Sequence, residues 1–173
     1  MARTWGARGV TPVVRVPGRR EGRVSVAALA CYRPGGRSRL IYRIHIYRRR
    51  KSEAASFTWR DYRDLIVMAH VQLGAPIVLV WDNLNRHICP DMRRFIADNA
   101  DWLRVFQLPS YAPDLNPVEG IWSLLNRSGL ANLAAANLDH LVRAIKRGLK
   151  KVQYRSHLID GCLAETDLVL KSS

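Results

Sequence analysis

Two neighbouring segments in the first third of the chain alternate between apolar and polar residues. Residues 23–31 begin as such a strand, and residues 40–47 resume the alternation after a turn at Pro34-Gly35-Gly36. A period of two residues is typical of a half-buried strand, and Pro and Gly favour the turn between two of them. The pattern therefore predicts an antiparallel hairpin. His45 lies inside its second strand, where a structural role is commoner than ligation.

A helical period follows the hairpin. Apolar residues recur one turn apart from Thr58 to Gln72, with Thr58 suited to an N-cap and Gly74 to the stop. Three later segments share this period of apolar positions. They are a short helix opened by Pro90, a helix from Asn116 that ends near Gly129, and a helix over 138–152 capped by Asn137.

Two segments between these helices are strands by a different pattern. Ile77-Val78-Leu79-Val80-Trp81 is an uninterrupted apolar run, which predicts a fully buried strand, and Trp102 to Leu108 is a second strand ended by Pro109. The second hairpin strand, the helix from Thr58 to Gln72 and the strand that ends before Asp82 are expected to form a right-handed crossover unit. Together with the hairpin, these elements predict an α/β domain with a mixed sheet.

The length of the chain suits one domain. With 173 residues it is expected to form a single core over residues 1–165, followed by a tail at 166–173. No apolar run approaches 18 residues, and we identify neither a membrane span nor a signal peptide. Cys31, Cys89 and Cys162 lack the paired spacing of a zinc site and are expected to fill space in the core.

The charge balance indicates a polyanionic partner. The chain has 28 Lys and Arg against 14 Asp and Glu, a formal charge of +14. Nucleic acid is the leading candidate, because each neutralised phosphate releases counterions. Two clusters are candidates for phosphate contact: Arg48, Arg49, Arg50 and Lys51 after the hairpin, and Arg143, Lys146, Arg147 and Lys150 on the outer face of the last helix. The first cluster could equally be a solvated charge run, and the second a complement to the helix dipole.

Two acidic residues occupy positions that are typical of a catalytic site. Asp82 follows the apolar strand directly, and Glu119 lies where a Pro- and Asn-rich loop turns into a helix. Ligands bind outside the carboxyl ends of strands in such sheets, so both groups can face one crevice. A structural alternative exists for each: Asp82 could cap the next turn, and Glu119 could form a capping box with Asn116.

These residues also resemble a known family. Asp82-Asn83 with His87 five residues after the Asp, then Leu108 to Glu119 (Leu-Pro-Ser-Tyr-Ala-Pro-Asp-Leu-Asn-Pro-Val-Glu), are similar to the catalytic core of IS630-type transposases. Those enzymes belong to the Tc1/mariner-like DDE superfamily of endonucleases. The resemblance extends over about residues 4 to 165, and 36 residues separate Asp82 from Glu119, in keeping with the family.

The resemblance implies a fold and a reaction. The fold is a ribonuclease-H-like mixed sheet flanked by helices, and the activity is DNA cleavage and strand transfer at transposon ends with Mg²⁺ or Mn²⁺. Asp82 and Glu119 would be the second and third metal-binding acids, with Asn83 and His87 in support. The partners would be transposon-end and target DNA and a second copy of the chain, in the cytoplasm and at the nucleoid of a bacterium.

One part of the family pattern is missing. The first acid belongs on a central strand ahead of Thr4-Trp5, and no such segment is present. We expect the chain to be incomplete or inactive alone and marginal in stability, unless Val13–Val16 fills the gap or an upstream polypeptide supplies the strand. The alternative to an endonuclease is a non-catalytic, basic nucleic-acid-binding remnant.

Overall fold

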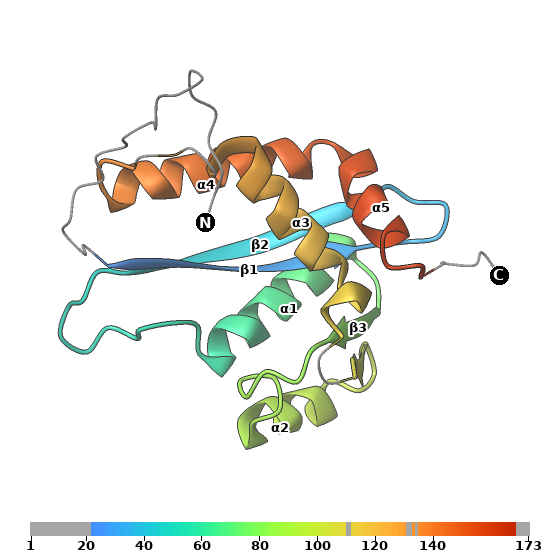
Figure 1. The fold of residues 1–173 in the computed structure, drawn as a ribbon. Coiled ribbons are helices and arrows are strands. Elements are labelled where there is room, and N and C mark those ends of the chain that lie inside the picture. Colours follow the sequence, from blue (N-terminus) through green and yellow to red (C-terminus); the bar gives the residue numbers. More distant parts are fainter. Residues whose placement is uncertain (1–21, 110–111, 131–132, 134, 169–173) are drawn as a thin grey trace.

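A computed structural model describes residues 22–109, 112–130, 133 and 135–168 (Figure 1). The short strand predicted at Val13–Val16 lies outside the described residues, as do Ser110 and Tyr111 of the family-like segment.

The predicted hairpin is confirmed. β1 (Arg23–Cys31) pairs antiparallel with β2 (Arg39–Tyr47) over their whole length, from Arg23 opposite Tyr47 to Cys31 opposite Arg39. Its turn is closed by the amide of Gly36, which donates to the carbonyl oxygen of Arg33 over 2.9 Å.

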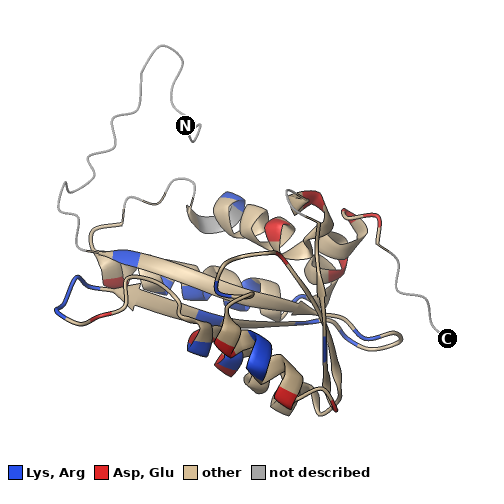
Figure 2. Ribbon diagram, turned by 90° about the horizontal axis from the view of Figure 1, so that it is seen from below, with Lys and Arg blue, Asp and Glu red and all other residues tan. Residues whose placement is uncertain are grey.

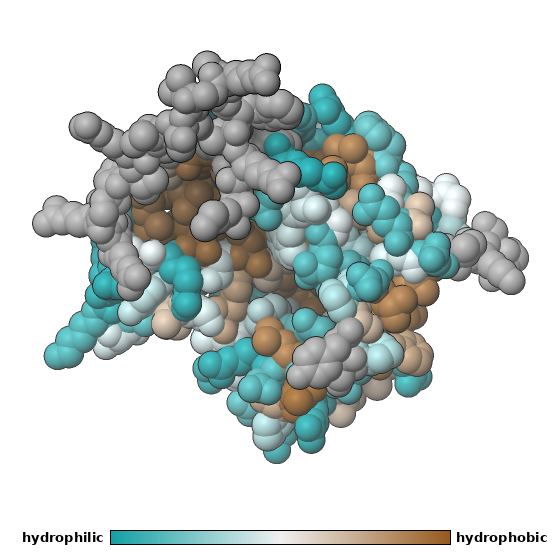
Figure 3. All heavy atoms as spheres, in the orientation of Figure 1, coloured by the Kyte–Doolittle hydropathy of each residue, from teal (hydrophilic) through white to brown (hydrophobic). Residues whose placement is uncertain are grey.

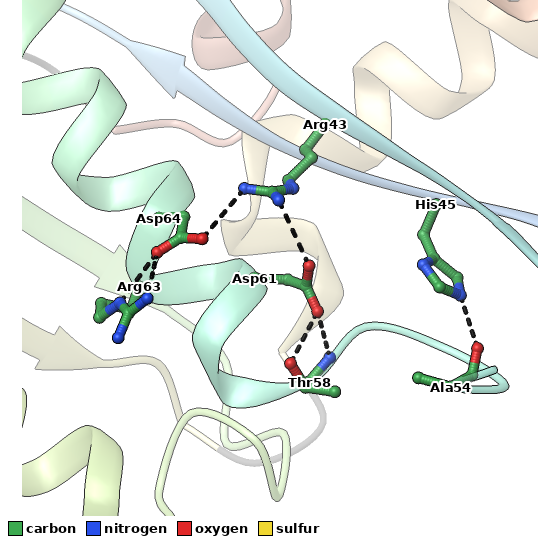
Figure 4. Close-up of polar contacts among 7 residues, drawn as sticks. All are labelled: Arg43, His45, Ala54, Thr58, Asp61, Arg63 and Asp64. Atoms are coloured by element: carbon green, nitrogen blue, oxygen red, sulfur yellow. Dashed lines mark hydrogen bonds and ion pairs between the residues drawn. The ribbon is translucent and has the colours of Figure 1, made fainter. Parts of the chain in front are cut away.

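Helix α1 (Trp59–Leu73) begins and ends at the predicted residues. Thr58 and Asp61 form a capping box, and Gly74 ends the helix with φ 61°, a left-handed conformation that Gly adopts at little cost. Figure 4 shows how α1 is fixed to the hairpin: Arg43 of β2 lies between Asp61 (3.6 Å) and Asp64 (3.5 Å). In the same view His45 contacts the carbonyl oxygen of Ala54 through Nε2 (2.7 Å), a structural role as expected.

The predicted crossover through α1 does not join two strands of one ladder, because β2 and the strand Ile77–Trp81 belong to separate ladders among the described residues. A parallel pair of strands comes next. β3 (Ile77–Trp81) and β4 (Leu103–Gln107) pair in parallel, with α2 (Pro90–Asp98) between them in sequence. One face of this pair is covered by α1 and α2, and there Leu79, Trp81 and Leu103 join Met92 in a buried cluster.

The other face of the parallel pair corrects the prediction of a fully buried strand. Val78 is 67% exposed, Val80 52% and Phe106 61%. Alternate residues of a strand point to opposite faces, and helices cover one of the two faces here. A parallel ladder with apolar residues on both faces is normally covered on both. Within the described part of the chain, no element covers this apolar face of the β3–β4 pair.

Three helices cover the side of the hairpin opposite α1. They are α3 (Pro117–Leu125), which continues through a π-helical turn at Asn126–Leu130, α4 (Leu138–Gln153) and α5 (Ser156–Ala164). The helical path thus passes Gly129, where the sequence predicted its end. α5 was not predicted, because it has nine residues, no side-chain cap and few charges to mark an outer face.

The strands form two separate ladders, β1–β2 and β3–β4. In Figure 1, α4 lies above the hairpin and α1 below it, which confirms the expected α/β class of strands flanked by helices. Within the described residues, β1 pairs with β2 alone and β3 with β4 alone, so each has a second edge without a strand partner. The central strand of the family-like sheet was expected between these two edges.

A groove of about 160 Å³ separates the ladders. Its walls come from four elements: Ala27, Ala28 and Leu29 of β1, Tyr62, Leu65 and Ile66 of α1, Val80 and Trp81 of β3, and Val118 and Trp122 of α3. Figure 3 shows hydrophobic residues in a recess near the middle of this side of the molecule, among hydrophilic ones. The described helices include none that is both long and apolar enough to cross a membrane.

Candidate active site

Asp82 directly follows the last residue of β3. The loops after the two parallel strands are joined there, because the Leu108 amide donates to the Trp81 carbonyl oxygen (2.8 Å) and the Asn83 side-chain amide to the Leu108 carbonyl oxygen (3.0 Å). Oδ1 of Asp82 accepts from the amide of Leu84 over 3.2 Å. Asn83 therefore supports the loop that presents Asp82.

Glu119 lies in the first turn of α3. The N-cap is Asn116, whose side-chain oxygen accepts from the amide of Val118 over 3.2 Å. The amide of Asn116 donates to the carbonyl oxygen of Pro113 (2.9 Å), so the capping box considered for Glu119 is not formed. Within the described residues, no hydrogen bond or ion pair engages the exposed carboxylate of Glu119. It is available to a ligand.

The two acids share one pocket. A cavity of about 370 Å³ has Asp82, Asn83 and Leu84 on one wall and Asn116 and Glu119 on the other. Its remaining lining residues are Leu108, Pro109, Ala112 and Pro113. Asp82 and Glu119 also line the groove between the ladders, so the pocket and the groove adjoin each other.

The buried side chain of His87 contacts Asp82 through its ring nitrogen Nδ1. Its Nδ1 lies 2.8 Å from Oδ1 and 3.2 Å from the main-chain oxygen of Asp82. Both are acceptors, so Nδ1 carries the proton. The side chain is buried and its ring stacks on Trp81, with 4.1 Å between centroids and an interplanar angle of 1°, while Tyr62 meets it edge-on at 4.7 Å. Burial lowers the pKa of His87, and Asp82 opposes that shift.

Two buried nitrogens beside Asp82 have no hydrogen-bond partner within the described residues: Nε1 of Trp81 and Nε2 of His87. Both side chains line the groove between the ladders. In the neutral ring Nε2 is an acceptor, whereas the Trp81 nitrogen is a donor. A buried polar atom without a partner costs about 1–3 kcal/mol, so these two nitrogens leave unsatisfied hydrogen-bonding capacity beside the groove. Trp81 was not singled out from the sequence, where it read as the last residue of an apolar strand.

The carboxylates fit a hard cation incompletely. Oδ2 of Asp82 and both oxygens of Glu119 are free of hydrogen bonds from described residues, and Mg²⁺ can bind through two carboxylates with water and substrate phosphate as its other ligands. No group of three or more His, Cys, Asp or Glu that could hold a metal occurs in the described ranges. Within the described residues, the pocket therefore offers two carboxylates.

The two basic clusters that are candidates for phosphate contact lie outside the pocket of the two acids. Arg48 to Lys51 are exposed in the loop between β2 and α1, and Arg143, Lys146, Arg147 and Lys150 are exposed along α4. Figure 2 shows the blue residues of the 48–51 loop at one end of the hairpin. None of these residues lines the pocket or the groove.

A family model described as DDE superfamily endonuclease matches residues 1–142. The chain belongs to this superfamily of endonucleases. The match includes both Asp82 and Glu119, so the pocket lies within the family-defining part of this DDE superfamily member.

Individual relatives of this DDE endonuclease chain are distant. The uncharacterized protein y4pE/y4sA of Sinorhizobium fredii (strain NBRC 101917 / NGR234) is 32% identical over 69 residues, which is 40% of this chain and 47% of that protein. The match therefore spans about half of the relative's length.

Among solved structures, the catalytic domain of Mos1 mariner transposase is similar at TM-score 0.46 and 12% identity, covering 86% of this chain and 83% of that one. The Mos1 strand transfer complex is similar at TM-score 0.48 and 12% identity, covering 98% of this chain and 50% of that one.

Proposed function

We propose that this chain is the catalytic part of an IS630-type, Tc1/mariner-like DNA transposase, which cleaves DNA strands at transposon ends and transfers them to a target. The observation that carries the proposal is the shared pocket of Asp82 and Glu119, at the carboxyl end of one strand and the first turn of one helix. Membership of the DDE superfamily supports the reaction class.

The residues of the pocket have distinct roles in this proposal. Asp82 and Glu119 bind the cation, and His87 fixes the rotamer of Asp82 through its Nδ1 proton. Asn83 joins the loops that follow β3 and β4 and so holds Asp82 at the rim. Asn116 caps the helix that presents Glu119.

The cation is Mg²⁺ or Mn²⁺. When bound, divalent ions activate the attacking oxygen and stabilise the leaving oxygen of a phosphodiester. Two carboxylates, each with at least one oxygen free of hydrogen bonds from described residues, suit such oxygen-preferring ions. The chain itself contributes the ligands and the rigid loops that keep them in place.

A third carboxylate comes from outside the described residues. We propose that an extended strand enters the groove between β1 and β3 and brings it, supplied by an upstream polypeptide or by a second copy in a homodimer. The free edges of β1 and β3, the apolar groove walls and the two partnerless nitrogens support this arrangement. The 173-residue chain alone would then lack cleavage activity, and the complete enzyme would act on DNA at the bacterial nucleoid.

Metal binding by the isolated chain tests the site without requiring activity. Mn²⁺ titration, followed by electron paramagnetic resonance, is expected to show binding that Asp82→Asn and Glu119→Gln each weaken by at least tenfold. Asp114→Asn is the matched control, because Asp114 is an exposed acid of the same loop outside the pocket lining. A loss of equal size in Asp114→Asn would overturn the assignment.

Cleavage distinguishes the transposase from the alternative, a basic nucleic-acid-binding remnant. Supercoiled plasmid should be nicked with Mg²⁺ or Mn²⁺ once a polypeptide bearing an acid-containing strand is added, and Asp82→Asn should abolish the nicking. Absence of Mn²⁺ binding together with metal-independent DNA binding would establish the remnant instead.

A further inference from the structure

The outer face of α4 is a row of cations. Val142, Ile145 and Leu149 of this helix are buried against the hairpin and α3. The exposed face carries Arg143, Lys146, Arg147, Lys150 and Lys151. In the described parts of the chain no ion pair involves these five residues, so their charge is not cancelled locally.

Each end of α4 is joined to a basic loop. At the start of the helix, Asp139 pairs with Arg48 over 2.6 Å, which brings the 48–51 loop alongside. At the end of the helix, the guanidinium of Arg37 donates to the carbonyl oxygen of Tyr154 over 3.0 Å, which brings the hairpin turn with Arg33 alongside. Figure 2 shows these two blue loops at opposite ends of the β1–β2 ladder.

The row occupies the C-terminal part of α4. Its cations span residues 143–151 of the helix, so at 1.5 Å per residue they extend about 12 Å along the axis. At 3.4 Å per nucleotide of each strand this length matches roughly three to four base pairs of duplex. The two loops extend the row beyond both helix ends.

We propose that α4 and its two flanking loops form a track that binds the phosphates of a nucleic-acid duplex, separately from the catalytic pocket. The track consists of Arg33 and Arg37, of Arg49, Arg50 and Lys51, and of Arg143, Lys146, Arg147, Lys150 and Lys151. This deepens the proposed function and rests on it for one detail, that the duplex is DNA.

The chemistry of the track favours a nucleic acid over a protein partner. Protein interfaces have an apolar centre with aromatic anchors and few charges. The exposed face of α4 between Asp139 and Lys151 contains no large exposed apolar side chain, and the nearest is Tyr154, 69% exposed, past the helix end. Phosphate backbones are bound by Lys and Arg, whatever the base sequence.

The position of the track determines which DNA it holds. α4 lies above the hairpin in Figure 1, whereas β3, which Asp82 follows directly, lies below it. The cations of α4 lie on the face opposite its buried residues, and none of them lines the pocket or the groove. The track therefore holds a duplex segment other than the strand being cut.

Fluorescence anisotropy of a labelled 20-base-pair duplex, titrated in EDTA over a range of salt concentrations, tests the track. Arg147→Gln/Lys150→Gln and Arg33→Gln/Arg37→Gln should each lower affinity several-fold and reduce the salt slope by about 1 per cation removed. Arg93→Gln/Arg94→Gln is the matched control, since it removes two exposed charges from α2 and leaves the track intact.

The outcomes separate this inference from the proposed function. Duplex affinity is measured in EDTA and Mn²⁺ binding is measured without DNA, so a chain that fails to bind Mn²⁺ can still possess the track. Equal losses in the α2 control and the track variants would show that net charge alone governs binding and would overturn the track. Displacement by polyglutamate as effective as by duplex at matched charge would overturn its assignment to nucleic acid.

Discussion

Nδ1 of His87 lies 2.8 Å from Oδ1 of Asp82, and the two side chains occupy opposite environments. The carboxylate is 59% exposed at the pocket, whereas the imidazole is 10% exposed between Trp81 and Tyr62. The exposed carboxylate is thus oriented by a buried imidazole that packs against two aromatic rings. This pairing limits the rotation of the Asp82 side chain, as its proposed role in metal binding requires.

Replacing His87 should weaken metal binding while leaving the fold intact. His87→Phe keeps a ring between Trp81 and Tyr62 but removes the proton given to Asp82, so Mn²⁺ affinity is expected to fall by about tenfold, as for other residues that orient a metal ligand. His45→Phe is the control, since His45 contacts Ala54 and Phe57 away from the pocket. Unchanged affinity in His87→Phe would contradict the role given to the imidazole.

The stability of the fold should depend on pH through His87. Burial lowers the pKa of His87 below its ordinary value of 6.5, so the unfolded chain binds this proton more readily than the folded one. The contribution is complete above pH 6.5 and is lost as the pH falls below that value toward the folded-state pKa. Urea unfolding midpoints between pH 8 and pH 5 should show this decline, and it should be smaller in His87→Phe.

Removing the N-cap of each of two helices should distinguish an effect on stability from an effect on metal binding. Asn116→Ala and Asn137→Ala each remove an N-cap, of α3 and α4 respectively, at a cost of about 0.5–2 kcal/mol in the free energy of unfolding. Only Asn116→Ala frays the turn that holds Glu119, so it alone should reduce Mn²⁺ affinity. Denaturant titration and Mn²⁺ titration of both variants check this, and equal Mn²⁺ affinities would argue against a fixed Glu119.

Two glycines should respond oppositely to alanine. A Cβ at Gly120 would lie 2.9 Å from Sγ of Cys162, so Gly120→Ala should push α3 from α5 and cost about 1–3 kcal/mol. A Cβ at Gly161 meets nothing within 4 Å, and Gly161→Ala in α5 should stabilise by about 0.5–1 kcal/mol. Thermal unfolding of the two variants measures the contrast. Equal shifts would show that α3 and α5 do not pack this closely.

Local signals in the sequence were enough for most of the elements. The alternation around residues 23–31 and 40–47 predicted the hairpin. Thr58 and Gly74 predicted both ends of α1, because the unpaired backbone groups at a helix end are satisfied by residues close to it in sequence. α5 escaped notice, because its nine residues are held by contacts with α3 and the hairpin and not by a cap or charge pattern of their own.

The sequence by itself determined the acids, the basic clusters and the family resemblance, because these depend on residue identity and spacing. Tertiary structure alone decided that Asp82 and Glu119 share a pocket, that Glu119 is free of its helix cap, and that the cations of α4 line neither the pocket nor the groove. It also showed one face of β3 exposed and a groove beside its free edge. Such relations depend on which elements pack together, and packing joins residues far apart in the chain that no local pattern connects.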